Sequence, residues 1–297
     1  MTSQTDFRTG YVGIIGRPNV GKSTLLNRLI GQKLSITSRK PQTTRQRITG
    51  ILNVDNGQLL FVDTPGFQIR HGSALNRSMN REATQAVADV DVVLFVVEAL
   101  RFSAEDNAAL KLIARHGCVI LVINKIDSIP ERALLLPFIA TMSQRHTFAE
   151  IVPVSASKGH AIKDLARTIR GYLPESAPIY QADEITESSE RFLASELIRE
   201  KMFRQLGDEL PYVSAVLIDS FTLVGTLRKI HASIIVDKES HKGIVVGAKG
   251  SRLKEIGTQA RIDMEKLFGG KVHLEVWVTV KRGWSENRQL LKRLGYG

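Results

Sequence analysis

The sequence contains a single cysteine, Cys118, and seven histidines. One cysteine excludes an internal disulfide, and its place in the apolar approach to an expected strand indicates a small core residue in a reducing compartment. The histidines show no spacing typical of a metal site, and neither internal repeats nor low-complexity tracts occur. The chain therefore falls outside the disulfide-rich, zinc-binding and repeat classes.

Long hydrophobic runs are missing as well. The run Val90–Val97 contains Asp91 and is far shorter than the roughly 20 residues that a membrane-spanning helix needs. Residues 1–6 have no signal-peptide core, and we expect them to form a short disordered lead. The chain has 297 residues, of which 43% are hydrophobic, and this is enough for two domains with separate cores.

A phosphate-binding loop is present near the N-terminus. Gly16–Ser23 reads G-R-P-N-V-G-K-S between the apolar run Tyr11–Ile15 and a helical pattern at Thr24–Ile30, which is the context this motif requires. Backbone N–H groups and the helix dipole would surround the phosphates. We expect Lys22 to reach the β- and γ-phosphates and Ser23 to bind Mg²⁺. The predicted contacts are Gly16, Arg17, Pro18, Asn19, Val20, Gly21, Lys22, Ser23 and Thr24.

A second motif predicts which base is bound. The motif Asn124-Lys125-Ile126-Asp127 follows the apolar run Val119–Ile123. Asp127 can accept from N1–H and the exocyclic N2 amine of guanine, a pair of donors that adenine lacks. We expect Asn124 to hold the loop and approach N7, and the stem of Lys125 to cover the base. Backbone N–H groups at Ser155 and Ala156 are expected to meet O6, so the predicted ligand is GTP or GDP.

The motif Asp63-Thr64-Pro65-Gly66 closes the apolar strand Leu59–Val62. We expect Asp63 to hold Mg²⁺ through water and the Gly66 N–H to sense the γ-phosphate. Thr64 and Pro65 complete the predicted nucleotide contacts.

A polar stretch upstream, Pro41–Arg45, is typical of a switch loop. One threonine in it should complete the Mg²⁺ shell; we favour Thr44, although spacing does not separate it from Thr43. The predicted metal ligands are Ser23, Thr44 and Asp63, and the predicted catalytic groups are Lys22, Thr44 and Gly66.

The dipeptide Asn56-Gly57 between two apolar runs predicts a type I′ hairpin. It places one antiparallel strand on an otherwise parallel sheet. The predicted fold of the first part is therefore α/β, a P-loop GTPase sheet with helices on both faces.

One residue that many small GTPases have is absent. The glutamine that orients the attacking water would follow Gly66, but this position holds Phe67 and Gln68 comes one residue late. Slow intrinsic hydrolysis is expected unless a partner or a cation supplies the missing stabilisation. Asn19 could lend its amide oxygen to K⁺ beside the phosphates, and an equal alternative is that it merely fits the turn.

The C-terminal third contains a different motif. Gly247-Ala248-Lys249-Gly250 lies after an expected strand, Ile244–Val246, and before a helical pattern with one apolar face. In a KH module such a G-x-x-G loop clamps about four nucleotides. Cations at a helix start oppose its dipole, so Lys249, Arg252 and Lys254 favour a polyanionic ligand. The predicted RNA contacts are Lys242, Gly247, Ala248, Lys249, Gly250, Arg252 and Lys254.

The surrounding pattern has the length of one module. Helix Glu190–Leu206, strands Tyr212–Phe221 and Leu227–Val236, the G-x-x-G helix and strand Lys271–Lys281 give the order α-β-β-α-β of a type II KH domain. In the last strand, valines and Leu274 alternate with polar residues and Trp277. We expect Trp277 to be covered by a helix or linker rather than to form an exposed stacking platform. The predicted domains are 8–174 and 191–297, joined by a linker at 175–190.

Charge follows the same division. The chain carries 41 Lys and Arg against 30 Asp and Glu, a net charge of +11. Residues 176–226 hold 4 basic and 9 acidic side chains, whereas residues 227–297 hold 15 and 7. The basic C-terminal part suits nucleic acid, and basic surface alone would also suit anionic lipid.

Together with Ser35–Arg45 and the stretch from Gln181 to Glu196, these motifs resemble the Era family of bacterial GTPases over nearly the whole chain. The resemblance implies a Ras-like GTPase domain, a type II KH domain, and an apolar residue at the position of Phe67. It also implies binding near the 3′ end of small-subunit ribosomal RNA and a role in maturing the 30S subunit. A cytoplasmic monomer without an obligate protein partner is expected, with peripheral inner-membrane contact in some members.

The expected function is a GTP-gated RNA clamp that releases RNA on hydrolysis. Two alternatives stay open: a constitutive RNA-binding scaffold that nucleotide only stabilises, and a membrane-associated regulatory GTPase whose basic face binds lipid.

Overall fold

The computed structural model describes residues 6–37, 44–45, 47–63, 84–85, 87–207 and 209–294. The chain forms two compact units, with the main division between Glu187 and Ser188. Each unit has its own sheet, and each is described by itself.

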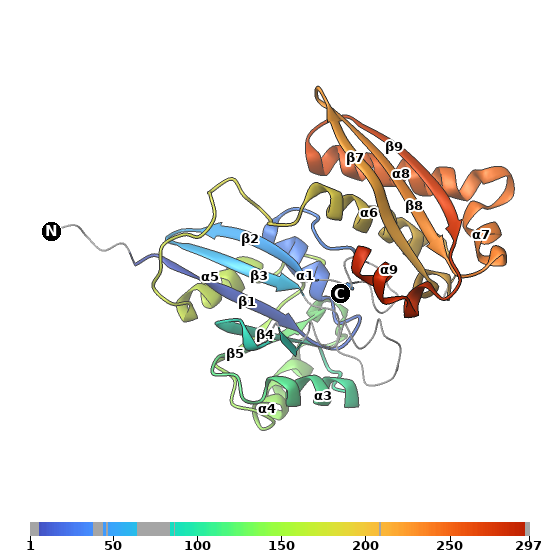
Figure 1. The fold of residues 1–297 in the computed structure, drawn as a ribbon. Helices are drawn as coiled ribbons and strands as arrows, with labels where there is room; N and C mark the ends of the chain where they lie inside the picture. The colour runs from blue at the N-terminus through green and yellow to red at the C-terminus, as the bar shows by residue number, and fades with distance from the viewer. Residues whose placement is uncertain are drawn as a thin grey trace. The chain divides into compact units, whose positions relative to one another are not determined.

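The first unit contains a six-stranded sheet in the order β2-β3-β1-β4-β5-β6 (Figure 1). Its strands are β1 (Arg8–Ile15), β2 (Ile48–Val54), β3 (Gly57–Asp63), β4 (Val92–Glu98), β5 (Val119–Asn124) and β6 (Glu150–Pro153). All neighbours are parallel except β2 and β3, which are antiparallel. The strand register pairs Val54 with Gly57, so the two-residue loop of the hairpin is Asp55-Asn56. Only Asn56 has a positive φ, of 52°, so the turn is not of the predicted type I′, which needs a positive φ at both loop positions. The predicted hairpin and the mostly parallel sheet are confirmed.

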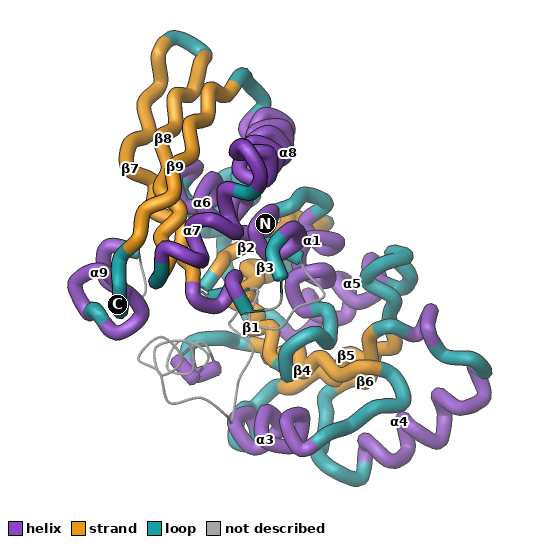
Figure 2. Tube along the Cα trace, turned by 90° about the vertical axis from the view of Figure 1, so that its right-hand side faces the viewer, coloured by secondary structure: helices purple, strands orange, loops and turns teal. Residues whose placement is uncertain are grey.

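Helices cover both faces of this sheet (Figures 1 and 2). They are α1 (Lys22–Ile30), α3 (Ala104–Ile113), α4 (Leu135–Ser143) and α5 (Ile162–Tyr172), with 3₁₀ turns at Ile126–Ser128 and Arg132–Leu134. Alternate residues of β4 pack with α3 and α4, and the residues between them are buried as well. Because β4 is buried on both faces, its sequence is a continuous apolar run. No helix in the described part of either unit is long and apolar enough to cross a membrane.

The acidic segment before Ser188 lies against β2 and β3 of the first unit. The Ile51 N–H donates to the Ile185 carbonyl, and the Thr186 hydroxyl donates to Thr49. The buried Gln58 side chain accepts from the N–H groups of Ile179 and Tyr180 at 2.8 and 2.9 Å. Much of the segment treated above as a linker is therefore hydrogen-bonded to the nucleotide-binding unit.

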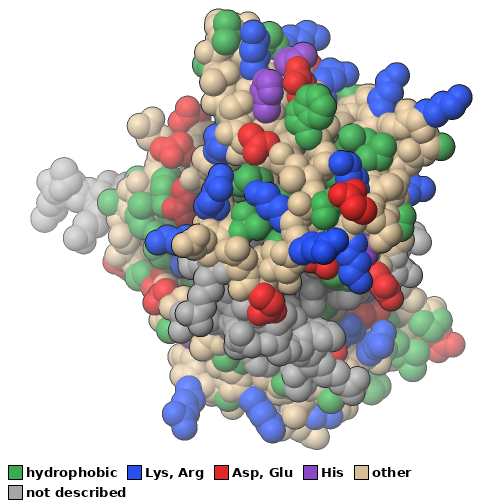
Figure 3. Space-filling model, turned by 45° about the vertical axis from the view of Figure 1, so that its right-hand side comes forward, with side chains coloured by type: hydrophobic (Ala, Val, Ile, Leu, Met, Phe, Trp, Pro, Cys, Tyr) green, Lys and Arg blue, Asp and Glu red, His purple; other side chains and the backbone are tan. Residues whose placement is uncertain are grey.

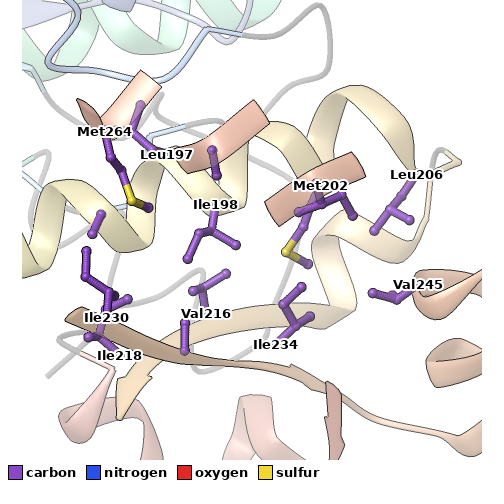
Figure 4. Close-up of a cluster of buried hydrophobic side chains, with 14 of the residues drawn as sticks. Leu197, Ile198, Met202, Leu206, Val216, Ile218, Ile230, Ile234, Val245 and Met264 are labelled. Carbon is purple, nitrogen blue, oxygen red and sulfur yellow. The ribbon is translucent and has the colours of Figure 1, made fainter. Parts of the chain in front are cut away.

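The second unit has a three-stranded sheet in the order β7-β8-β9. Its elements are α6 (Glu190–Gln205), β7 (Ser214–Val224), β8 (Leu227–Val236), α7 (Glu239–Val246), α8 (Ser251–Phe268), β9 (Val272–Val280) and α9 (Arg288–Arg293), with 3₁₀ turns at Leu210–Val213, Ala248–Gly250 and Trp284–Glu286. β7 and β8 are antiparallel, and β8 and β9 are parallel. Figure 4 shows the core, in which Ile198 and Met202 of α6 and Met264 of α8 pack on Val216, Ile230 and Ile234.

The prediction of a strand immediately before the G-x-x-G loop is wrong. Ile244–Val246 is the last turn of α7, an additional helix between β8 and α8. A short apolar run fits either state. In the helix only Val245 is buried, while Ile244 stays 44% exposed.

The predicted cover over Trp277 is also wrong, because its side chain is 61% exposed. The chain after β9 turns back near the start of β7, where the buried Trp284 donates to the Val213 carbonyl at 2.9 Å. Ala215 and Ile235 are buried at that end of the outer sheet face. Trp277 is in the next row of the same face, with Ser233 and Leu217, and this row is not covered by the chain after β9.

Replacing Gln58 tests the attachment of the 179–187 segment. Gln58→Ala leaves the N–H groups of Ile179 and Tyr180 without their acceptor, which costs about 1–3 kcal/mol. We expect a lower free energy of unfolding in urea and faster proteolysis between residues 176 and 187. The exposed Gln32→Ala serves as the control and should change neither. Equal proteolysis of the two variants would contradict the attachment.

Candidate functional site

Polar residues of the first unit gather at the carboxyl ends of its parallel strands. The phosphate loop follows β1, Asp63 ends β3, Glu98 ends β4 and Asn124 ends β5, while Ser155 comes two residues after β6. The carboxyl edge of an open α/β sheet is where ligands bind in this class of fold. The structure thus brings motifs from five places in the sequence to one edge.

Two glycines of the phosphate loop are required by close approach of other groups. A Cβ on Gly16 would lie 2.4 Å from the Val96 carbonyl oxygen, and one on Gly21 would lie 2.4 Å from Asn124 Nδ2. Gly21 also has a φ of 100°, which other residues rarely adopt. The loop therefore packs directly on β4 and on the base-recognition motif.

Lys22 lies inside the loop. Its ammonium donates to the carbonyls of Gly16 and Arg17, both at 3.0 Å. Burial lowers the pKa of Lys22 to about 8, although the nearby Asp63 carboxylate opposes the shift. A polyphosphate would supply the negative charge that the buried ammonium lacks.

The three predicted metal ligands meet beneath the loop. Ser23 Oγ lies 2.9 Å from Asp63 Oδ2 and 3.0 Å from Thr44 Oγ1, and the Thr44 hydroxyl is 3.2 Å from the same carboxylate oxygen. Ser35 also donates to Asp63 Oδ2, whereas Oδ1 has no hydrogen-bond partner in the described part of the chain. Burial raises the pKa of Asp63. This all-oxygen set, with one buried carboxylate oxygen unused, fits Mg²⁺.

Asn124 joins the phosphate loop to the loop after β6. Its Nδ2 donates to the Val20 carbonyl at 2.8 Å, and its Oδ1 accepts from the Ala156 N–H at 3.0 Å. The side chain is 2% exposed. Asn124 therefore has the loop-holding geometry expected of it.

Asp127 is held by two serines. Ser155 Oγ donates to Oδ1 at 2.5 Å, and Ser157 Oγ donates to Oδ2 at 3.2 Å. The Ser155 hydrogen bond lowers the pKa of Asp127, so the carboxylate is ready to accept from a base. Ser157 is a site residue that the sequence analysis missed.

An arginine of α1 is hydrogen-bonded to the backbone of the loop after β6. Arg28 donates to the carbonyls of Ala156 and Ser157, at 3.0 and 2.6 Å. Its position near the end of a helix gave no signal in the sequence.

Two acidic residues pair with Arg17 of the phosphate loop, and one of them, Glu98, also pairs with the base motif; the sequence analysis missed both. Arg17 donates to Glu98 at 2.7 Å and to the buried Asp106 at 3.0 Å, and Lys125 pairs with Glu98 at 3.2 Å. Burial alone would raise the pKa of Glu98, but Arg17 and Lys125 hold it below its usual range. The Arg17 side chain, predicted as a nucleotide contact, is thus engaged in this ionic link. Glu98 could have been found from its place at the carboxyl end of β4.

Some predicted residues fall outside the described part of the chain. These are Thr64, Pro65 and Gly66, with Phe67 and the alternative switch threonine Thr43. Pro18, Asn19, Val20 and Thr24 lie in the described loop and helix start, and Asn19 has a left-handed φ of 64°.

The second unit has a groove of about 340 Å³ between α8 and β9. Of the predicted RNA contacts, Gly250 and Lys254 line it. The other lining residues were missed: Leu253, Gly257, Thr258, Arg261, Leu274 and Val276. Those on α8 follow Gly250 at helical spacing, a signal that the sequence contains.

The remaining predicted contacts surround the groove's end. Gly247 and Gly250 have φ of 72° and 78°, and Lys249 between them has 49°, so the loop depends on its glycines. Arg252 donates to the Ile244 carbonyl at 2.6 Å and so fastens α7 to α8. Ala248 and Lys249 in this loop, and Lys242 in α7, are exposed.

These two units define the class of protein: a P-loop GTPase followed by a KH module. Family models agree, since a 50S ribosome-binding GTPase model matches residues 11–125 and a KH domain model matches residues 209–285.

Among relatives, the GTPase Era of Nitrosomonas eutropha is 56% identical over 99% of both chains. That of Neisseria meningitidis serogroup A is 52% identical over 97% of this chain and 95% of its own. Among solved structures, a single-residue variant of Aquifex aeolicus Era bound to GDP.AlF4⁻ is 40% identical with a TM-score of 0.94, covering 98% of this chain and 100% of that one. A second structure, of Era with MgGDPNP and nucleotides 1506–1542 of 16S ribosomal RNA, has the same identity and TM-score and covers 98% and 99%. The chain belongs to the Era family and is a GTPase.

Replacing Asp127 tests how the base is read. Asp127→Asn presents an N–H where guanine also presents donors, so GDP affinity should fall at least about 100-fold. Xanthosine diphosphate, which has an acceptor in place of the N2 amine, should bind the variant better than GDP does. Fluorescent-nucleotide titration measures both affinities. Unchanged preference for GDP would contradict this role of Asp127.

Proposed function

We propose that the protein is a GTP-gated RNA clamp that binds near the 3′ end of small-subunit ribosomal RNA and assists maturation of the 30S subunit. The observation that carries the proposal is the pairing, in one chain, of a nucleotide site and a KH groove. A relative of matching fold over nearly the whole chain was solved with MgGDPNP and a 16S ribosomal RNA fragment.

In the nucleotide site, this chain's residues bind and orient rather than react covalently. Lys22 supplies positive charge to the β- and γ-phosphates, and Asn124 keeps the base loop aligned with the phosphate loop. Ser23, Thr44 and Asp63 would hold Mg²⁺, which neutralises charge on the phosphates when bound. The position that supplies a water-orienting glutamine elsewhere is Phe67 here, so intrinsic hydrolysis is slow.

The proposed gate starts at Thr44. Its hydroxyl meets Ser23 and Asp63, so a γ-phosphate with its cation would bias the switch segment that ends there. The same switch segment leads into β2, the strand to which Ile185 and Thr186 are hydrogen-bonded. Nucleotide state can thus reach the segment that precedes the KH unit along β2 and through its hydrogen bonds with Ile185 and Thr186.

In the KH groove, Gly250 permits close approach of the RNA backbone, and the exposed Lys254 lies beside it. Gly257 lies inside α8, where glycine costs about 1 kcal/mol relative to alanine. Its missing side chain leaves the groove floor open to Val276.

Fluorescence anisotropy with a single-stranded oligonucleotide from the 3′ end of small-subunit ribosomal RNA tests this function. At fixed salt, we expect tight binding with a non-hydrolysable GTP analogue and at least about tenfold weaker binding with GDP. Gly250→Asp should abolish binding, because a strained φ and a carboxylate are introduced at the phosphate contact.

A matched control uses Gly269→Asp, which places the same side chain at another positive-φ glycine, at the far end of α8. It should bind RNA normally. Equal affinity with GTP analogue, GDP and no nucleotide would replace the gated clamp with a constitutive RNA-binding scaffold.

We also propose that K⁺ binds beside the phosphates through the Asn19 amide oxygen. Asn19 is in a left-handed conformation, and its side chain has no hydrogen-bond partner among the described residues. Potassium should then accelerate GTP hydrolysis relative to sodium, and Asn19→Ala should remove the difference while changing GDP affinity little. Equal phosphate release in both salts would contradict a K⁺ site.

A further inference from the structure

Trp277 projects from the outer face of the KH sheet, the face opposite α6 and α8. The strand register places it in one row with Ser233 of β8 and Leu217 of β7. It is 61% exposed, whereas Trp284, the other tryptophan, is 1% exposed. An aromatic ring this exposed on an edge strand does not pack in the core and is open to a ligand.

This ring is next to the RNA groove in the chain and in the sheet. β9 is an edge strand, and its residues Leu274 and Val276 line the groove on one face. Trp277 follows Val276 directly and points to the other face, because side chains alternate along a strand. An RNA chain that leaves the groove therefore has to cross only this edge strand to reach the indole.

The groups around Trp277 suit an uncharged, flat ligand portion attached to an anionic chain. Lys229 and His273 lie in one row of the same face, and His231 and Glu275 lie in the row between them and Trp277. Glu275 is paired with His273 at 3.0 Å and lies 3.6 Å from His231. The other nearby acid, Asp219, accepts from Ser233 at 2.7 Å.

Lys229, by contrast, is exposed and has no ion pair among the described residues. Figure 3 shows histidine, basic and hydrophobic side chains together on one face of the molecule. Both acids thus have hydrogen-bonding or ionic neighbours on this face, while the Lys229 ammonium stays available to a phosphate.

We propose that Trp277 is a stacking platform for an unpaired base of the RNA, immediately outside the stretch held in the α8–β9 groove. This proposal rests on the RNA-binding function proposed above and extends its site to the opposite face of β9. Stacking on an aromatic ring tolerates any base, so the platform adds affinity rather than sequence preference.

An abasic scan combined with substitution of Trp277 tests the platform. Single abasic sites are introduced one at a time along the 3′-terminal ribosomal RNA strand, and affinities are measured for the full chain with a GTP analogue. In the unaltered protein and in Trp277→Phe, one position beside the groove-bound nucleotides should weaken binding about tenfold when its base is removed. In Trp277→Ala the same removal should cost nothing further.

Leu223→Ala is the matched control, because Leu223 is equally exposed, at 63%, on the β7–β8 hairpin of the same unit. It should leave every affinity unchanged. Tryptophan emission gives a second readout: RNA should quench it in the unaltered protein and not in Trp277→Phe, where the buried Trp284 remains.

Additive effects of Trp277→Ala and every abasic site would overturn the platform. So would an unchanged RNA affinity of Trp277→Ala, which would leave this face to a protein partner. Failure of the proposed RNA-binding function would look different, since no oligonucleotide would then bind the unaltered protein.

Discussion

The nucleotide site depends on one buried side chain, Asn124. Its amide donates to the phosphate loop at Val20 and accepts from the base loop at Ala156, so two segments more than 100 residues apart share one group. Because the amide is 2% exposed, removing it would leave a backbone carbonyl and a backbone N–H without partners, at about 1–3 kcal/mol each. The packing of Gly21 against the same amide shows how closely the loop is fitted to it.

A second, ionic connection runs beside the first. Arg17 and Lys125 share the carboxylate of Glu98, and Arg17 also reaches Asp106 at the start of α3. The neutral and the ionic link both join phosphate recognition to base recognition. The positions of the phosphate loop and the base loop are therefore coupled, and a nucleotide has to fit both loops at once. These links contrast with the hydrogen bonds among Ser23, Thr44 and Asp63, which a bound γ-phosphate and its cation can replace.

Much of this architecture could be predicted from the sequence, because several of its patterns are long or chemically specific. The alternation along β9, the Asn56 turn and the phosphate loop each match a strict spacing, and all three elements were located correctly. Ile244–Val246 was wrongly assigned to a strand, because a run of three apolar residues is too short to show whether its period is that of a strand or of a helix. The exposure of Trp277 depends on where the chain after β9 turns, which local sequence does not encode. Arg28 and Asp106 were missed because their partners lie far away in the chain, and pairing of this kind becomes visible only in the fold.

Amide hydrogen exchange in the nucleotide-free protein tests the role of Asn124 most directly. Asn124→Ala should speed exchange both in peptides covering the phosphate loop, residues 16–23, and in peptides covering the base loop, residues 154–158. Peptides from the KH unit should exchange as in the unaltered protein. If only one of the two loops lost protection, or neither did, Asn124 would not be the connection on which the site depends.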